Sequence, residues 1–185
     1  MPMIETQRLR LVPITLEMVE GVLCHDKTAA ERGLDRVLAE AGLPTGARFP
    51  DAWPNDDLVA RAFDASLEAI RANPDVRLWG DTMVLPRKGP PLVIGSVVFH
   101  GKPENGIAEI GYGVEESSRG QGLASEATHA CVDWALAQPG IEAVQATTFP
   151  WHLASLGVIR KCGMAPCGTR EHPMFGELHV FERRR

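Results

Sequence analysis

Cysteine is scarce in this sequence and follows no recognisable pattern. The four cysteines, Cys24, Cys131, Cys162 and Cys167, form no C-x-x-C pair, and their spacing matches no zinc-binding pattern. The six histidines are scattered as well, with no H-E-x-x-H stretch. We therefore expect no metal site and no disulfide framework, and we interpret the cysteines as small buried hydrophobic residues that stay reduced.

Positive charge is also limited. The chain has 19 lysines and arginines against 24 aspartates and glutamates, which gives a formal net charge of −5. A general nucleic-acid binder, or a protein that binds anionic membranes, would carry a basic surplus, so both classes are disfavoured. A local phosphate site is compatible with this balance, because backbone N–H groups at a helix start can supply it.

Long apolar runs are missing too. No stretch approaches the ~20 apolar residues that a membrane span requires. The first residues, Met1 to Thr6, show neither the basic region nor the apolar segment with which a secretory signal begins. We therefore expect a cytoplasmic protein that makes no contact with a membrane.

The composition that remains is that of a globular protein, with 44% hydrophobic and 23% charged residues. The length of 185 residues suits one domain, so we expect residues 1–185 to form a single unit. Helical periodicity dominates the first third, where Thr28 and Glu31 have the spacing of a capping box that opens a helix. A further helix is predicted to begin at Asn55 and to be closed by Asn73-Pro74. Strand formers then alternate with Gly/Pro-rich loops, which predicts an antiparallel meander of residues 78–85, 92–100 and 107–114.

The last third alternates between helices and strands. A helix follows Gly122, and the remaining segments predict a strand at 142–149, a short helix from Trp151 or His152 to Cys162, and strands at 164–170 and 177–183. The predicted fold class is therefore α+β, with a mixed, mostly antiparallel sheet flanked by helices.

The most informative stretch runs from the strand at 107–114 into the next helix. Gly111 and Gly113 weaken that strand, and such glycines mark a bulge or a close approach of the backbone to another group. We expect a bulged central strand. The Arg119–Gly122 turn then opens a helix, where free backbone N–H groups beside an arginine suit a phosphate. A hairpin followed by an ordinary Gly-capped helix is the alternative.

Paired strand glycines, then Arg-x-x-Gly-x-Ala, then a helix resemble the acetyl-CoA-binding core of the GNAT acyltransferase superfamily. Ala108–Tyr112, Glu126-Ala127 and the opening Glu5–Leu11 are similar to its RimJ/RimL-type branch. Thr148–Ser155 and Lys161–Met164 occupy the place of the family's Asn-x-x-Ser helix and its Gly-Phe ending. The resemblance covers the first strand and roughly residues 78–170.

The resemblance implies acetyl-CoA as a cosubstrate. Its pyrophosphate would lie on the backbone N–H groups of residues 120–124, and its pantetheine would lie beside residues 110–114. An N–H group near Gly113 and Val114 would polarise the thioester carbonyl, as an oxyanion hole does. The implied cofactor contacts are Tyr112, Gly113, Val114, Arg119, Gly120, Gln121, Gly122, Leu123, Ala124, His152 and Ser155.

Acetyl transfer to an amine requires a base for the ammonium and a donor for the departing thiolate. Strand alternation places Glu109 on one face with the two glycines, so Glu109 is the predicted base. A half-exposed strand carboxylate with a salt partner is the alternative. Many relatives donate from a tyrosine, but its expected position holds Ile159, so Ser155 is the predicted donor. A serine that makes local backbone bonds at a helix start is the alternative.

His152 departs from the family pattern, which has Asn at that position. An imidazole can donate a hydrogen bond to the cofactor as an amide does, or carry a proton near pH 7, and we keep it as a catalytic candidate. An ordinary residue at the helix start is the third interpretation. Phe49 and Trp53 lie in a Gly/Pro-rich loop, where they either fill the edge of the core or line the acceptor site.

The predicted function is acetyl-CoA-dependent N-acetyl transfer, by direct attack of a primary amine of a protein N-terminus or a small molecule. A non-catalytic acyl-CoA-binding or sensing domain is the alternative, because His152 replaces Asn and the helix lacks a tyrosine. A phosphate binder of another fold is a third reading, although the chain lacks the G-x-x-x-x-G-K-[ST] pattern of a P-loop. The sequence leaves open which amine accepts the acetyl group and whether the chain forms a homodimer.

Overall fold

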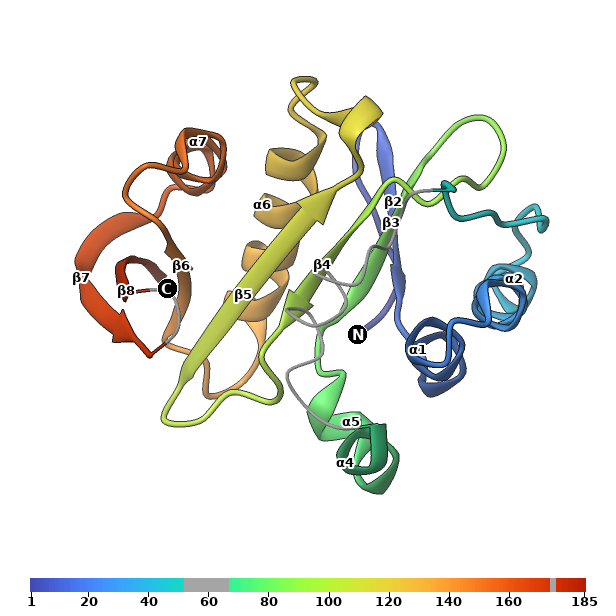
Figure 1. Ribbon diagram of the computed structural model, residues 1–185, viewed down its shortest axis with the longest axis horizontal. Helices are drawn as coiled ribbons and strands as arrows, with labels where there is room; N and C mark the ends of the chain where they lie inside the picture. Colours follow the sequence, from blue (N-terminus) through green and yellow to red (C-terminus); the bar gives the residue numbers. More distant parts are fainter. Residues whose placement is uncertain (52–66, 174–175) are drawn as a thin grey trace.

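A single mixed sheet organises the chain (Figure 1). The structure is a computed structural model that describes residues 1–51, 67–173 and 176–185. Within these ranges, eight strands lie in the order β1-β2-β3-β4-β5-β6-β8-β7. The strands are β1 (Ile4–Glu5), β2 (Leu9–Pro13), β3 (Thr82–Pro86), β4 (Gly95–Phe99), β5 (Ile107–Val114), β6 (Ala143–Thr148), β7 (Ala165–His172) and β8 (Gly176–Arg184).

The helices lie before and between these strands. They are α1 (Leu16–Leu23), α2 (Lys27–Glu40), α4 (Leu67–Ala72), α5 (Pro74–Arg77), α6 (Leu123–Ala137) and α7 (Leu153–Lys161), with a short 3₁₀ turn, η1, at Glu116–Ser118. Strand β5 pairs in parallel with β6, whereas the other neighbouring strands pair antiparallel. The predicted α+β class, with a mostly antiparallel sheet and a β3–β4–β5 meander, is confirmed.

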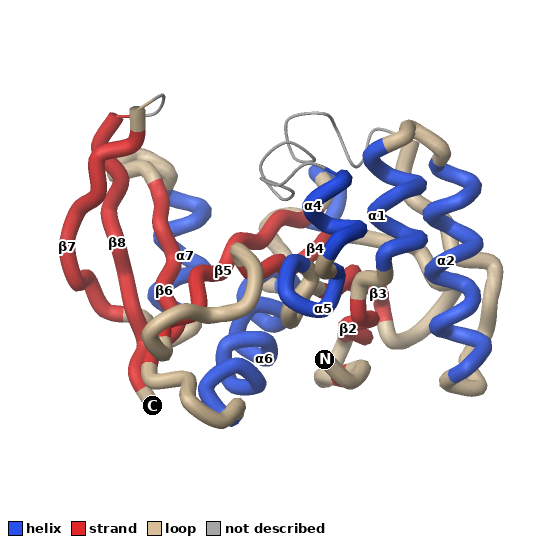
Figure 2. The backbone as a smooth tube through the Cα atoms, turned by 90° about the horizontal axis from the view of Figure 1, so that it is seen from below, coloured by secondary structure: helices blue, strands red, loops and turns tan. Residues whose placement is uncertain are grey.

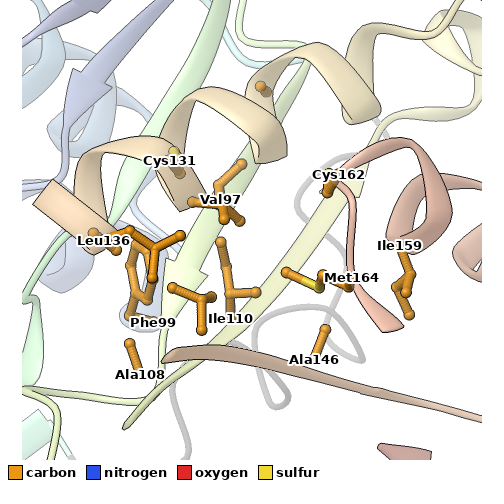
Figure 3. Packing of buried hydrophobic residues seen from close by; sticks show 14 of the residues in the cluster. Val97, Phe99, Ala108, Ile110, Cys131, Leu136, Ala146, Ile159, Cys162 and Met164 are labelled. Carbon is orange, nitrogen blue, oxygen red and sulfur yellow. The ribbon is translucent and has the colours of Figure 1, made fainter. Parts of the chain in front are cut away.

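Two hydrophobic cores cover the two faces of the sheet. Because side chains alternate along a strand, Val97 and Phe99 of β4 pack in the core on α6, whereas Val98 packs in the core with α1 and α2. Figure 2 shows α6 on one side of the sheet and α1, α2 and α4 on the other. Figure 3 shows Phe99 and Ile110 packed beside Cys131 and Leu136 of α6.

The predicted capping box is wrong. Helix α2 begins one residue before Thr28, with Asp26 as its N-cap, and the Asp26 carboxylate accepts from the backbone N–H of Ala29 at 2.9 Å. Aspartate is preferred over threonine at the N-cap of a helix, so Asp26 caps α2 in place of Thr28. Glu31 instead accepts from the backbone N–H of Phe49 at 2.9 Å.

The loop that follows α2 was expected to hold two aromatic candidates. Phe49 is buried in the core with α1 and α2, so it fills the edge of that core. Trp53 and most of the helix predicted from Asn55 lie outside the described residues. Helix α4 is the part of that segment that the structure describes, and Pro74, predicted to close it, begins the short helix α5.

The predicted bulge in the central strand is also wrong. Strands β4 and β5 pair in continuous register from Gly95↔Val114 to Phe99↔Ile110. The close approach is at Gly95 of β4, where a Cβ would lie 2.3 Å from the carbonyl oxygen of Gly113, whereas a Cβ on Gly111 would come no nearer than 3.5 Å to its neighbours. The two backbones therefore come together without an inserted residue. A register shift occurs between β7 and β8, at Pro166 and Gly168.

Candidate functional site

Strands β5 and β6 part in the middle of the sheet. Their parallel ladder ends at the pair Glu109↔Gln145, although β5 continues to Val114 and β6 to Thr148. Residues 110–114 of β5 therefore pair with β4 on one side, and no strand of the described sheet pairs with their other side. Figure 1 shows β5 running away from β6 toward the loop before α6. Unpaired strand groups of this kind can hydrogen-bond to an extended ligand.

The loop before α6 presents backbone N–H groups at a helix start. Gly120 and Gly122 have positive φ angles of 75° and 76°, a conformation that strongly favours glycine, and Gly122 is the N-cap. The first helical hydrogen bond runs from Glu126 N to Gly122 O, so the N–H groups of residues 123–125 have no helical acceptor. Such groups at the positive end of a helix suit an anion.

Arg119 connects this loop to the end of β5. Its Nε donates to the carbonyl oxygen of Val114 at 3.4 Å, and its side chain is exposed. The structure thus brings the predicted phosphate-binding residues 119–124 next to the predicted pantetheine-binding residues 112–114. Both groups lie at the open end of β5.

Tyr112 and Ser155 form a hydroxyl pair, which the sequence analysis did not foresee. The Tyr112 hydroxyl lies 2.9 Å from Ser155 Oγ and also donates to the Ser155 carbonyl oxygen at 3.2 Å. Burial raises the pKa of Tyr112 to about 12, although the hydrogen bond with Ser155 opposes that shift. The phenol is therefore neutral at physiological pH. The two residues are 43 positions apart, and the placement of α7 beside α6 and β6 brings them together.

Glu109 has partners on two other strands. Thr147 Oγ1 of β6 donates to it at 3.2 Å, and Arg170 Nη1 of β7 contacts both carboxylate oxygens at 3.0 and 3.1 Å. The side chain of Glu109 is 22% exposed. A salt partner for this carboxylate, weighed as the alternative to a base, is therefore present.

The predicted base Glu109 and the predicted donor Ser155 lie on opposite faces of the sheet, near the point where β5 and β6 separate. Alternation along β5 puts Glu109 on the face away from Tyr112, and Tyr112 packs against the core on α6. Ser155 shares the Tyr112 side through their hydrogen bond. A thioester lying along the unpaired edge of β5 would pass between the carboxylate and the hydroxyl pair.

His152 occupies the start of α7. It is the N-cap residue, its side chain is exposed, and that side chain makes no capping hydrogen bond. Its ring lies 6.0 Å from the exposed ring of Trp151, which stacks on Phe149 at 4.8 Å. Ile159, at the position where relatives have a donor tyrosine, is fully buried in the core and cannot act there.

The cysteines divide into two pairs. Cys131 and Cys162 are buried, as predicted, and burial raises the pKa of each thiol to about 12. Cys24 and Cys167 are exposed, so the prediction of burial is wrong for them. In the part of the chain that the structure covers, no group of three or more His, Cys, Asp or Glu side chains is placed to hold a metal ion. No helix among those residues is long and apolar enough to span a bilayer.

Comparisons with known proteins agree with this arrangement. Residues 8–165 match the family model described as an acetyltransferase (GNAT) domain. The uncharacterized N-acetyltransferase YjdG of Bacillus subtilis is 27% identical over 164 residues, which cover 88% of this chain and 89% of that protein.

Solved structures show the same fold at lower identity. The GNAT-family acetyltransferase from Bacillus anthracis superposes with a TM-score of 0.63 at 18% identity, over 99% of this chain and 98% of that one. RimL, a ribosomal L7/L12 alpha-N-protein acetyltransferase solved with coenzyme A, gives a TM-score of 0.61 at 16% identity, over 99% and 98% of the two chains.

Proposed function

Since this chain belongs to the GNAT acetyltransferase family and uses acetyl-CoA, we propose that it transfers the acetyl group directly to a primary amine. The acceptor is a protein N-terminus or a small-molecule amine. The observation that carries the proposal is the parting of β5 and β6 after Glu109, which leaves an unpaired strand edge between a carboxylate and a hydroxyl pair. The N-acetyltransferase relatives, one of which acts on a protein alpha-amine, support an amine acceptor.

The loop before α6 is the proposed pyrophosphate site. The free N–H groups of Gly120, Gln121, Gly122, Leu123 and Ala124 would donate to the phosphate oxygens, and Arg119 would add a forked cation. Backbone donors and one arginine are enough for a single pyrophosphate, so the net charge of −5 presents no conflict. The pantetheine would then hydrogen-bond along residues 110–114.

The proposed chemistry is one addition followed by one elimination. The amine nitrogen attacks the thioester carbonyl carbon, and a backbone N–H group near Gly113 and Val114 stabilises the oxyanion. Before the attack, Glu109 accepts a proton from the acceptor ammonium, directly or through a water molecule, because an ammonium has no free electron pair. The tetrahedral intermediate then breaks its C–S bond and expels the thiolate of coenzyme A. The nitrogen loses its second proton as the amide forms, and this proton balances the one that the thiolate takes up, so the products are the acetylated amine and the thiol of coenzyme A.

Ser155 is the proposed donor to that thiolate. The Tyr112 hydroxyl has a single proton. When it donates that proton to Ser155 Oγ instead of to the Ser155 carbonyl oxygen, the Ser155 proton is left free to point toward the sulfur. The interaction strengthens as negative charge develops on sulfur, so it acts on kcat rather than on cofactor affinity. His152 lies one turn before Ser155 and is the second candidate donor.

Binding and turnover test the proposal separately. Thermal shift with acetyl-CoA, coenzyme A and ATP should show stabilisation by the two coenzyme A species alone. Gly122→Asp should abolish that stabilisation, because it puts bulk and negative charge among the N–H donors. Calorimetry should show that Arg119→Ala loses about 1–3 kcal/mol of binding free energy, the range for a charge-assisted hydrogen bond. Unchanged affinity in both variants, with both folded, would overturn the phosphate site.

Turnover is measured by release of free thiol over a library of peptides and small amines. With at least one primary amine, we expect the enzyme to release coenzyme A and to form the acetylated amine in equal amounts. Stabilisation by coenzyme A together with failure to acetylate any amine in the library would contradict transfer, and would favour a sensing domain of the same fold.

A further inference from the structure

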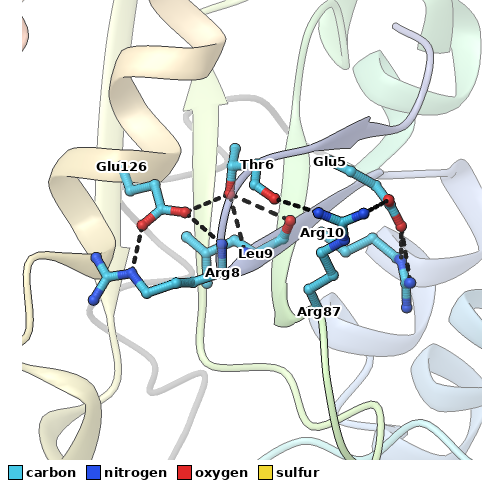
Figure 4. Close-up of polar contacts among 7 residues, drawn as sticks. All are labelled: Glu5, Thr6, Arg8, Leu9, Arg10, Arg87 and Glu126. Carbon is cyan, nitrogen blue, oxygen red and sulfur yellow. Dashed lines mark hydrogen bonds and ion pairs between the residues drawn. The ribbon is translucent and has the colours of Figure 1, made fainter.

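The opening segment Glu5–Leu11 and the helix segment Glu126-Ala127, which both resemble the RimJ/RimL-type branch, are joined by the carboxylate of Glu126 (Figure 4). Glu126, in the first turn of α6, accepts from Thr6 Oγ1 at 2.6 Å and from Arg8 N at 2.8 Å with one oxygen. Its other oxygen accepts from Arg8 Nε at 2.6 Å. Burial raises the pKa of Glu126, but the hydrogen bonds from Thr6 and Arg8 outweigh it and the net pKa is lowered. The carboxylate is therefore ionised and holds Arg8 in place.

Arg8 also reaches the proposed pyrophosphate loop. Its Nη1 donates to the carbonyl oxygen of Gln121 at 2.9 Å, and its Nη2 lies 3.7 Å from the position of a Cβ on Gly122. Gln121 stands between Gly120 and Gly122, which both have positive φ angles. Because glycine has the largest backbone freedom, an external contact such as the one from Arg8 restrains the orientation of the Gln121–Gly122 peptide group.

The orientation of this peptide group decides what the loop offers a ligand. In a trans peptide the C=O and the N–H point in opposite directions, so a Gln121 carbonyl turned toward Arg8 turns the Gly122 N–H away from it. A flipped peptide would present the carbonyl oxygen in place of the N–H. An oxygen in that position would repel a phosphate, whereas an N–H donates to it.

We infer that Arg8 is a positioning residue for the pyrophosphate of acetyl-CoA. The Glu126 carboxylate fixes the orientation of the Arg8 guanidinium by accepting from Arg8 Nε. The guanidinium in turn donates to the Gln121 carbonyl oxygen and so keeps the N–H of the Gln121–Gly122 peptide facing the ligand. The inference rests on the proposed phosphate site and adds to it a residue more than a hundred positions away in the sequence. Arginine suits this role because its planar fork reaches two acceptors at once, which a lysine ammonium does with less geometric control.

The test compares two ligands that share the thiol arm and differ in the 3′-phosphoadenosine diphosphate, which includes the pyrophosphate. Coenzyme A contains the pyrophosphate, whereas pantetheine contains only the thiol arm. Calorimetry, with displacement titration for the weaker ligand, gives the affinity of wild type, Arg8→Met, Arg8→Lys and Arg10→Met for both. Arg10 is the matched control, because it is a neighbouring arginine that pairs with Glu5 and makes no contact with the loop.

We expect Arg8→Met to weaken coenzyme A binding about tenfold, equivalent to about 1.4 kcal/mol, and to leave pantetheine binding unchanged. Arg8→Lys should fall between wild type and Arg8→Met, and Arg10→Met should bind both ligands as wild type does. A merely structural role for Arg8 would weaken both ligands together.

Three results would overturn the inference. They are an unchanged affinity of Arg8→Met for coenzyme A, an equal loss for both ligands, and an equal loss of coenzyme A affinity in Arg10→Met. A wild-type protein that binds pantetheine but gains nothing from the phosphates of coenzyme A would instead show that the proposed phosphate site itself is wrong.

Discussion

Removing the hydroxyl of Tyr112 tests how the site handles the departing thiolate. Tyr112→Phe keeps the ring that packs against the core on α6 and deletes the group that lies 2.9 Å from Ser155 Oγ. Ser155 keeps its own hydroxyl but loses the partner that orients it. We therefore expect the variant to fold and to bind acetyl-CoA normally while turning over more slowly.

The size of the loss follows from the hydrogen bond. A neutral hydrogen bond contributes about 0.5–1.5 kcal/mol, which corresponds to a fall in kcat of roughly 2- to 13-fold. Ser155→Ala removes the bond to the charged thiolate itself, worth about 1.5–3 kcal/mol, and should lower kcat by roughly 10- to 150-fold. Since Tyr112 acts through Ser155, the double variant should be no slower than Ser155→Ala alone.

Steady-state kinetics of the three variants on one accepted amine measure these effects. The KM for acetyl-CoA should stay constant, because the interaction forms as charge develops on sulfur. With a pKa of about 12, Tyr112 stays protonated below about pH 10, so Tyr112→Phe should keep the shape of the wild-type pH–rate profile there. Losses that multiply in the double variant would refute the reasoning, as would a rise in KM equal to the fall in kcat.

Three further predictions follow from the described contacts. Glu109→Gln should lower kcat roughly 10²–10⁴-fold and leave the affinity for acetyl-CoA intact. The loss in kcat should shrink at high pH, where the amine is already deprotonated. Wild-type kcat in this variant at neutral pH would show that Glu109 serves only as a salt partner of Arg170. His152→Asn should keep the kcat and the pH–rate profile, and disappearance of one limb of that profile would identify His152 as the proton carrier. Burial raises the pKa of Asp81 well above its usual range, so its contribution to stability is complete below pH ~4 and is lost as the pH rises through the raised pKa. Urea denaturation at pH 5 and at pH 8 should therefore show a smaller fall in the free energy of unfolding for Asp81→Asn than for wild type. An equal fall in the two proteins would contradict this.

Local chemistry predicted the elements around the site closely. The strand expected at 107–114 is β5 with the same ends, and the helix expected after Gly122 is α6. Both depend on neighbouring residues alone: glycine permits the positive φ at the helix start, and alternating apolar residues form a strand. Where two local solutions compete, sequence reasoning failed, since Asp26 displaced Thr28 as the cap of α2.

Local sequence patterns do not predict which residues contact the candidate site residues. Arg170 contacts Glu109 because β7 and β8 fold back beside β6, and nothing in either local sequence marks the pair. Tyr112 is predicted to contact the cofactor, whereas its hydroxyl contact with Ser155 follows only from the placement of α7 beside α6 and β6. Gly111 and Gly113 of β5 predict a bulge, whereas β4 and β5 pair without one, and the glycine that permits their close approach is Gly95 of β4.

The sequence by itself determined the α+β class, the strand and helix that frame the site, and the resemblance to the GNAT family. These depend on periodicity, on capping and on short motifs, whose interactions span a few residues. Only the tertiary structure decided that β5 parts from β6 after Glu109, that Tyr112 meets Ser155, and that Arg8 reaches the loop before α6. Those contacts join residues 36 to 113 positions apart, and their geometry depends on how whole elements pack, which no local pattern encodes.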